Sequence, residues 1–136
     1  AIDAIESACE RPLEAGEPSS VLVLFHVETV LEVNRRRGYA AGDRLLIALS
    51  RALRTSLPRA RIRARWSGST FAALLSGEGA ADVIERARGA LGHVAVSHAP
   101  EAFPVRIRCG FAARRPGASA PEWVAAAEDA LRQTGG

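Results

Sequence analysis

Three histidines are the residues of this chain that first suggest chemistry, because imidazole is a common metal ligand. They are His26, His93 and His98, and we expect all three to lie on strands. Their spacing is irregular, no cysteine stands beside them, and no acidic residues are placed to orient their rings. We therefore predict no metal site. The sequence also shows no Ser-His-Asp arrangement and no pair of carboxylates suited to acid–base catalysis.

The most regular pattern is an alternation of arginine and apolar residues over residues 61–66. A period of two is typical of a strand with one buried face, and a second apolar run follows over residues 70–75. Three small residues, 67–69, separate the two runs and predict a turn. We expect a β-hairpin whose arginines either attract an anion or form a solvent-facing edge.

The remaining elements surround this hairpin. Residues 21–27 form a continuous apolar run, which predicts a central strand buried on both faces. Asp43 stands at an expected helix N-cap, Gly92 is expected to stop a later helix, and a capping box begins at Ser119. We predict helices over 1–15, 30–37, 43–56, 79–91 and 119–133, and further strands over 94–98 and 105–111.

The hairpin follows an apolar strand by about forty residues and comes just after an amphipathic helix. This arrangement resembles the GGDEF domain of diguanylate cyclases, in which the hairpin tip carries Gly-Gly-Asp/Glu-Glu-Phe. The segment 127–131 matches the family's closing Ala-Asp-x-Ala-Leu, whereas the opening Asp-x-Leu-Thr-Gly-Leu-x-Asn-Arg is absent. The five signature positions of this chain are Ser67, Gly68, Ser69, Thr70 and Phe71.

The resemblance spans residues 20–133 and implies an α+β fold similar to nucleotidyl cyclases. We expect a central, mainly antiparallel sheet of about five strands flanked by helices. At 136 residues the chain is long enough for one domain. We divide it into an N-terminal helix and linker over 1–19 and a degenerate GGDEF domain over 20–136. Because the chain begins at Ala1, we expect it to be cut from a longer protein.

The resemblance also implies where catalysis would occur. Joining two GTP molecules needs divalent metal ions, held in this family by an Asp at the end of the first strand and by acidic residues at the hairpin tip. Those positions fall on His26, Ser69 and Thr70, none of which is acidic. Glu28 is the nearest carboxylate in the sequence. We therefore expect no diguanylate cyclase activity, no catalytic residue, no metal and no cofactor.

Two positions that read guanine in the family keep a matching residue, namely Asn34 and Asp43. Each also has a structural interpretation, since Asp43 suits a helix N-cap and Asn34 could close the preceding helix. Arg35 and Arg65 are candidates for phosphate contacts, or else solvated cations at a helix end and a strand edge. The family's product-inhibition motif Arg-x-x-Asp falls on residues 58–61, which lack both required side chains.

Composition excludes several other classes of function. All 18 basic residues are arginine, and the net charge is +3, but the arginines are scattered and no nucleic-acid-binding motif is visible. We expect no nucleic acid partner.

No transmembrane segment or signal peptide is recognisable, so we expect a cytoplasmic protein without membrane insertion. Cys9 and Cys109 show no CxxC spacing, and we expect them to be free buried thiols.

These observations predict a catalytically inactive GGDEF-like domain that acts as a regulatory or protein-interaction module of a bacterial signalling protein. Its partner would be another protein or a flanking domain of the same chain, and a homodimer stays open. The alternative is a non-catalytic nucleotide sensor that holds GTP or cyclic di-GMP through Asn34, Asp43 and nearby arginines. Binding lost on replacing Asp43 would separate the sensor from a docking module.

Overall fold

A computed structural model describes residues 20–134. The helix predicted over 1–15, Cys9 and Gly135–Gly136 lie outside these residues. The chain forms β1 (Ser20–Val27), α2 (Thr29–Arg37), α3 (Tyr39–Ser56), β2 (Ile62–Ser67), β3 (Thr70–Ser76), α4 (Ala80–His98), β4 (Ile107–Ala113) and α5 (Ala120–Gln133). The expected α+β class is confirmed.

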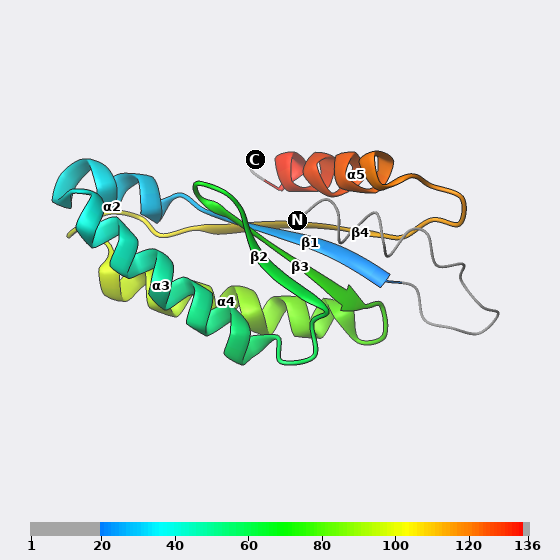
Figure 1. The fold of residues 1–136 in the computed structure, drawn as a ribbon. Coiled ribbons are helices and arrows are strands. Elements are labelled where there is room, and N and C mark those ends of the chain that lie inside the picture. Colours follow the sequence, from blue (N-terminus) through cyan, green and yellow to red (C-terminus); the bar gives the residue numbers. More distant parts are fainter. Residues whose placement is uncertain (1–19, 135–136) are drawn as a thin grey trace.

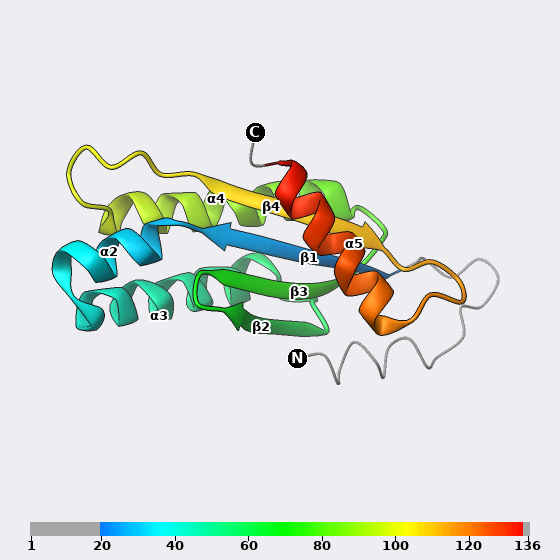
Figure 2. The same cartoon turned by 90° about the horizontal axis from the view of Figure 1, so that it is seen from above.

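The four strands form one antiparallel sheet in the order β2-β3-β1-β4. Helices α3 and α4 lie against one face of this sheet and α5 lies against the other, as Figure 1 shows. The view from above in Figure 2 places β1 between β3 and β4, with α5 crossing over the sheet. The described residues therefore contain four strands, where the sequence predicted about five.

Strand β1 is the centre of both halves of the core. Its side chains alternate between the two faces, because successive residues of a strand point in opposite directions. Val23 and Phe25 face α3 and α4, whereas Leu22 and Leu24 pack with Trp123 of α5. All five side chains are almost completely buried. The prediction of a strand buried on both faces is confirmed.

The predicted end of the fourth helix was wrong. We expected Gly92 to stop it and residues 94–98 to form a strand, but α4 continues through both to His98. The reason is that Leu91 and Ala95 are one turn apart and both are fully buried, so the helical face still packs on the core. This packing outweighs the cost of about 1 kcal/mol for one glycine inside a helix.

The predicted start of the third helix was also wrong. Helix α3 begins at Tyr39 and not at Asp43, which lies one turn inside the helix with an exposed side chain. Ala41 and Leu45 are buried one turn apart, so the apolar face of the helix begins before Asp43. Asp43 consequently does not act as an N-cap, and Gly38 occupies that position with φ of 88°.

Several local signals are confirmed, with small shifts in the ends of elements. The hairpin turn consists of two residues, Gly68 and Ser69, where three were expected, and the last strand runs to Ala113 and not only to 111. The capping box of α5 forms as predicted: Glu122 N–H donates to the Ser119 hydroxyl, and the Ser119 N–H donates to the Glu122 carboxylate. Local side-chain chemistry therefore fixes where α5 begins.

Glycine is required where α5 crosses β4. A Cβ on Gly110 would lie 2.1 Å from the backbone nitrogen of Leu131, whereas a Cβ on the exposed Gly89 of α4 would meet nothing within 4 Å. We expect Gly110→Ala to destabilise the domain by about 3 kcal/mol, because the clash is with backbone and α5 must move. Gly89→Ala should instead stabilise it by about 0.5 to 1 kcal/mol through helix propensity.

Urea unfolding followed by circular dichroism measures both changes. Equal stability of the Gly110→Ala variant and the unmodified domain would show that α5 does not pack as closely on β4 as described.

Candidate functional site

The tip of the hairpin lies directly beside the end of β1. Thr70 is the cross-strand neighbour of His26, and the His26 Nδ1 and Thr70 Oγ1 atoms are 3.0 Å apart in a hydrogen bond. The N–H of Val27 donates to the carbonyl of Ser69 at 2.8 Å. His26 and Thr70, which are 44 residues apart in the sequence, are therefore joined by their side chains, and a backbone hydrogen bond joins the residues next to them.

A polar row crosses the end of the sheet on the face that carries α5. His26 has Thr70 as its neighbour on β3 and Arg108 as its neighbour on β4. Directly opposed residues of antiparallel strands point to the same face, so the three side chains form a continuous row. We call it the Thr70–His26–Arg108 row. It lies where the family resemblance predicts the carboxylates of a cyclase.

The environment of His26 favours the neutral imidazole. Partial burial lowers the pKa of His26 below its ordinary value, and the nearby Arg108 guanidinium lowers it further, whereas Glu28 acts in the opposite direction. The Nε–H of Arg108 is buried and has no hydrogen-bond acceptor among residues 20–134. The row therefore offers a neutral ring, a hydroxyl and a cation.

This set of groups is a poor site for a hard divalent cation. Mg²⁺ and Ca²⁺ are held by oxygen ligands, mostly carboxylates, and an adjacent guanidinium repels them. Within the described residues, no group of three or more His, Cys, Asp or Glu side chains is placed to share a metal ion. His93 and His98 lie far along the chain from His26, on α4.

The five positions at the hairpin tip divide into exposed and buried residues. Ser67 and Gly68 are exposed, whereas Ser69 and Thr70 keep only 6% and 7% of their surface accessible and Phe71 belongs to the core. Two hydroxyl side chains therefore occupy the buried part of the tip, and one of them bonds to His26. Phe71 packs where an aromatic residue is expected.

The two candidate guanine-reading residues, Asn34 and Asp43, lie on the neighbouring helices α2 and α3. The side-chain oxygen of Asn34 packs against Gly42 so closely that a Cβ there would lie 1.6 Å away. Asn34 also accepts the Gly38 N–H through its backbone carbonyl, as expected of a residue that closes a helix. Asp43 directly follows Gly42 in the sequence and lines a hollow together with Arg65. Asn34 is not among the residues that line this hollow.

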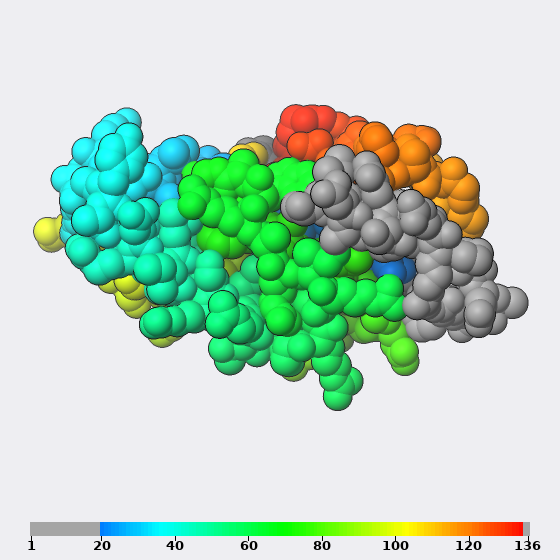
Figure 3. Space-filling model, in the orientation of Figure 1, coloured from blue at the N-terminus to red at the C-terminus, as the bar shows by residue number. Residues whose placement is uncertain are grey.

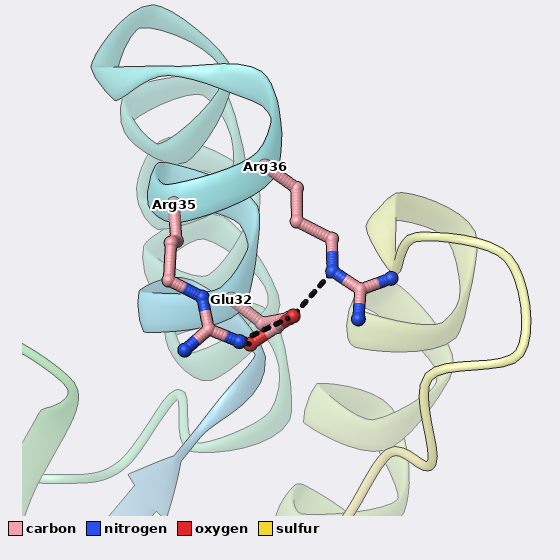
Figure 4. Close-up of polar contacts among 3 residues, drawn as sticks. All are labelled: Glu32, Arg35 and Arg36. Atoms are coloured by element: carbon pink, nitrogen blue, oxygen red, sulfur yellow. Dashed lines mark hydrogen bonds and ion pairs between the residues drawn. The ribbon is translucent and has the colours of Figure 1, made fainter.

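Arg35, a candidate for phosphate contact, is engaged by a neighbouring carboxylate. Glu32 is only 8% exposed, and its two oxygens accept from Arg35 Nη2 at 2.7 and 3.0 Å. Its Oε1 atom also forms an ion pair with Arg36 Nε at 2.5 Å, as Figure 4 shows. One carboxylate thus serves two arginines at the i,i+3 and i,i+4 positions of α2. The charge of Arg35 is therefore partly neutralised within the helix itself.

Arg65 differs, because it belongs to a cationic hollow between α3 and β2. The hollow has a volume of about 600 Å³ and is lined by Asp43, Leu46, Ile47, Ser50, Arg51, Arg54 and Arg65. Arg51 and Arg54 were not among the site residues predicted from the sequence. The sequence shows that Arg51 and Arg54 lie at helical spacing from Asp43. It does not show that β2 lies beside α3, because only the fold brings these two segments together.

The sequence of residues 2–135 matches the protein-family model for the GGDEF domain of diguanylate cyclases. The chain belongs to the GGDEF domain family. No curated protein sequence matches it. Within the described part of this GGDEF domain, no helix is long and apolar enough to cross a membrane.

Solved structures agree with the family. The diguanylate cyclase SiaD of Pseudomonas aeruginosa, solved in complex with its activator SiaC, is 30% identical with a TM-score of 0.82. The match covers 98% of this chain and 52% of the SiaD chain, so this chain spans about half the length of that relative.

Two further structures show the same fold at lower identity. The GGDEF domain of DgcB from Caulobacter crescentus, solved in complex with c-di-GMP, is 22% identical with a TM-score of 0.79, and the match covers 96% of this chain and 80% of that one. The FimX GGDEF domain of Pseudomonas aeruginosa is also 22% identical with a TM-score of 0.79, with 98% and 84% covered.

The lowered pKa of His26 predicts a pH dependence of stability. Above the unfolded-state pKa of about 6.5 both states are neutral, and folding gains nothing from this residue. As the pH falls below that value, the unfolded state takes up the proton first, so stability falls until the folded-state pKa is passed. We expect His26→Gln to remove this loss between pH 7.5 and pH 5.

Urea unfolding of both proteins at a series of pH values measures the difference. His93→Gln, which changes an exposed ring on α4, serves as the control and should leave the profile as it is. A His26→Gln profile that parallels the unmodified one would contradict the prediction.

Proposed function

We propose that this GGDEF domain makes no cyclic di-GMP and serves as a regulatory, protein-interacting module of a bacterial signalling protein. The observation that carries the proposal is the Thr70–His26–Arg108 row, which stands where the resemblance places metal-binding carboxylates. The five positions of the hairpin tip supply hydroxyl groups and no acid. On this proposal the GGDEF signature has degenerated while the fold has been kept.

The chemistry of the reaction supports this proposal. Attack of a 3′-hydroxyl on a triphosphate needs metal ions that activate the nucleophile and neutralise the leaving pyrophosphate. A neutral imidazole and a hydroxyl provide no negative charge to hold such ions, and Arg108 adds a positive charge beside them. One guanidinium can attract phosphate, but it does not lower the pKa of a hydroxyl nucleophile as a bound metal ion does.

The role in protein interaction rests on a different kind of support. A relative of 30% identity, the diguanylate cyclase SiaD, is known in complex with its activator SiaC, so a protein that contains a domain of this family is found in an assembly with a partner. The protein-binding role does not depend on any of the missing carboxylates.

The proposal predicts no cyclic di-GMP from GTP and Mg²⁺ or Mn²⁺, measured by liquid chromatography of the reaction mixture. It further predicts that the triple variant His26→Asp/Ser69→Glu/Thr70→Glu gains Mn²⁺ binding that the unmodified domain lacks, because the cross-strand neighbours 26 and 70 then both carry carboxylates and the adjacent position 69 adds a third. Electron paramagnetic resonance of Mn²⁺ measures the bound fraction.

The matched control is Ser67→Glu/Gly68→Glu, which adds charge at exposed positions of the same hairpin. Cyclic di-GMP formed by the unmodified domain would refute the proposal. Equal Mn²⁺ binding by the triple variant and the control would show that the polar row is not the place of the missing site.

A nucleotide sensor is the second candidate, because Asp43 and Arg65 line one hollow. The pairing of Arg35 with Glu32 argues against it, since one of the two predicted phosphate contacts is already engaged within α2. We expect calorimetric titration with GTP or cyclic di-GMP to give no heat of binding at millimolar nucleotide. Micromolar binding that Asp43→Ala abolishes would make the domain a sensor instead.

A further inference from the structure

The hollow between α3 and β2, which we call the α3–β2 groove, has the composition of a docking surface. Asp43, Ile47, Ser50 and Arg54 follow one another at intervals of three or four residues, so they form one stripe along α3. From Asp43 to Arg54 this stripe is about 16 Å long at 1.5 Å per residue. Figure 3 shows α3 and the hairpin side by side on one face of the molecule.

Within residues 20–134, no ion pair balances the arginines of the groove. Arg51, Arg54 and Arg65 line it, with Asp43 as its single carboxylate. Among residues 20–134, the ion pairs of the domain involve other arginines: Arg35 and Arg36 with Glu32, Arg88 with Glu85, and Arg132 with Asp129. The three groove arginines are therefore available to external carboxylates or phosphates.

The groove also presents an apolar contact between its charges. Ile47 is 53% exposed and Leu46 is half-buried beside it. Along α3, this apolar pair separates Asp43 from Arg51 and Arg54. A ligand that fits must cover an aliphatic side chain in the middle and present negative charge toward the arginine end.

We propose that the α3–β2 groove binds an acidic, amphipathic segment of a partner protein. This inference rests on the proposed function and names the surface and the chemistry through which the module acts. A second copy of the domain does not fit, because the net charge of the chain is +3 and joining two such grooves would oppose like charges. A free phosphate group fits the arginines but leaves Ile47 exposed to water.

The test uses a fluorescein-labelled synthetic helical peptide with glutamates at one end and leucines at i and i+3 in its middle. Fluorescence anisotropy at physiological salt measures its binding to the whole domain. We expect Arg51→Glu/Arg54→Glu to weaken binding by about 10-fold or more, and Arg65→Glu to weaken it by about 5-fold, because attraction becomes repulsion. Ile47→Ser should weaken it by about 5-fold through loss of apolar contact.

A charge-matched control separates the groove from general electrostatics. Arg37→Glu/Arg115→Glu changes the net charge by the same amount at two exposed positions outside the groove. We expect it to weaken binding by less than about 2-fold, since neither arginine lines the groove and salt screens the interaction of exposed charges with a ligand that they do not contact. Thermal unfolding of each variant confirms that the fold is retained.

Three outcomes would overturn the inference: no peptide binding by the unmodified domain, equal weakening by the control, or displacement of the peptide by micromolar GTP or pyrophosphate. The last would assign the arginines to a phosphate ligand. The cyclase assay on the same preparation keeps the two proposals apart. Product formation would refute the inactive module, whereas missing peptide binding without product would refute only the groove.

Discussion

Burial of β1 on both faces is the constraint on which the rest of this structure depends. Five consecutive residues of β1, from Val21 to Phe25, are buried, so the strand needs a packed layer on each side. Helices α3 and α4 supply one layer and α5 the other. The close contact of Gly110 with α5 shows how tightly the second layer is held against the sheet.

The same constraint fixes the geometry of the candidate site without fixing its chemistry. A slip of one residue between β1 and β3 would turn every apolar side chain of one strand to the wrong face, so the core sets the register. That register alone brings position 26 beside position 70. Neither residue belongs to the two apolar core clusters, so packing of the core does not dictate which polar side chains stand there. Such independence is what allows the proposed loss of catalysis without loss of structure.

Much of this fold could be predicted from sequence, because its strongest signals are local. The alternation in the hairpin, the apolar run of β1 and the capping box at Ser119 each identified an element correctly. The errors arose where tertiary packing competes with a local signal. Gly92 and Asp43 are ordinary stop and start signals, yet both lie inside helices whose buried faces extend past them.

The site was harder to predict than the fold for a related reason. His26 and Thr70 were placed by analogy with the family, but Arg108 became part of the site only through the pairing of β4 with β1. The ion pairs of Glu32 with Arg35 and Arg36 follow helical spacing and could have been predicted. The α3–β2 groove could not, because it exists only where two distant segments meet.

The arginines of β2 show how one residue type serves both stability and recognition. Strand β2 is at the edge of the sheet, where charged side chains discourage pairing with other chains. Arg63 is exposed but donates to the carbonyl of Leu57 at 2.6 Å, which ties the end of α3 to the strand. Arg65, two residues along the same side, lines the groove. The hydrogen bond from Arg63 thus joins the two elements that form the groove, and any such link that holds before binding lowers the entropy cost of binding a partner.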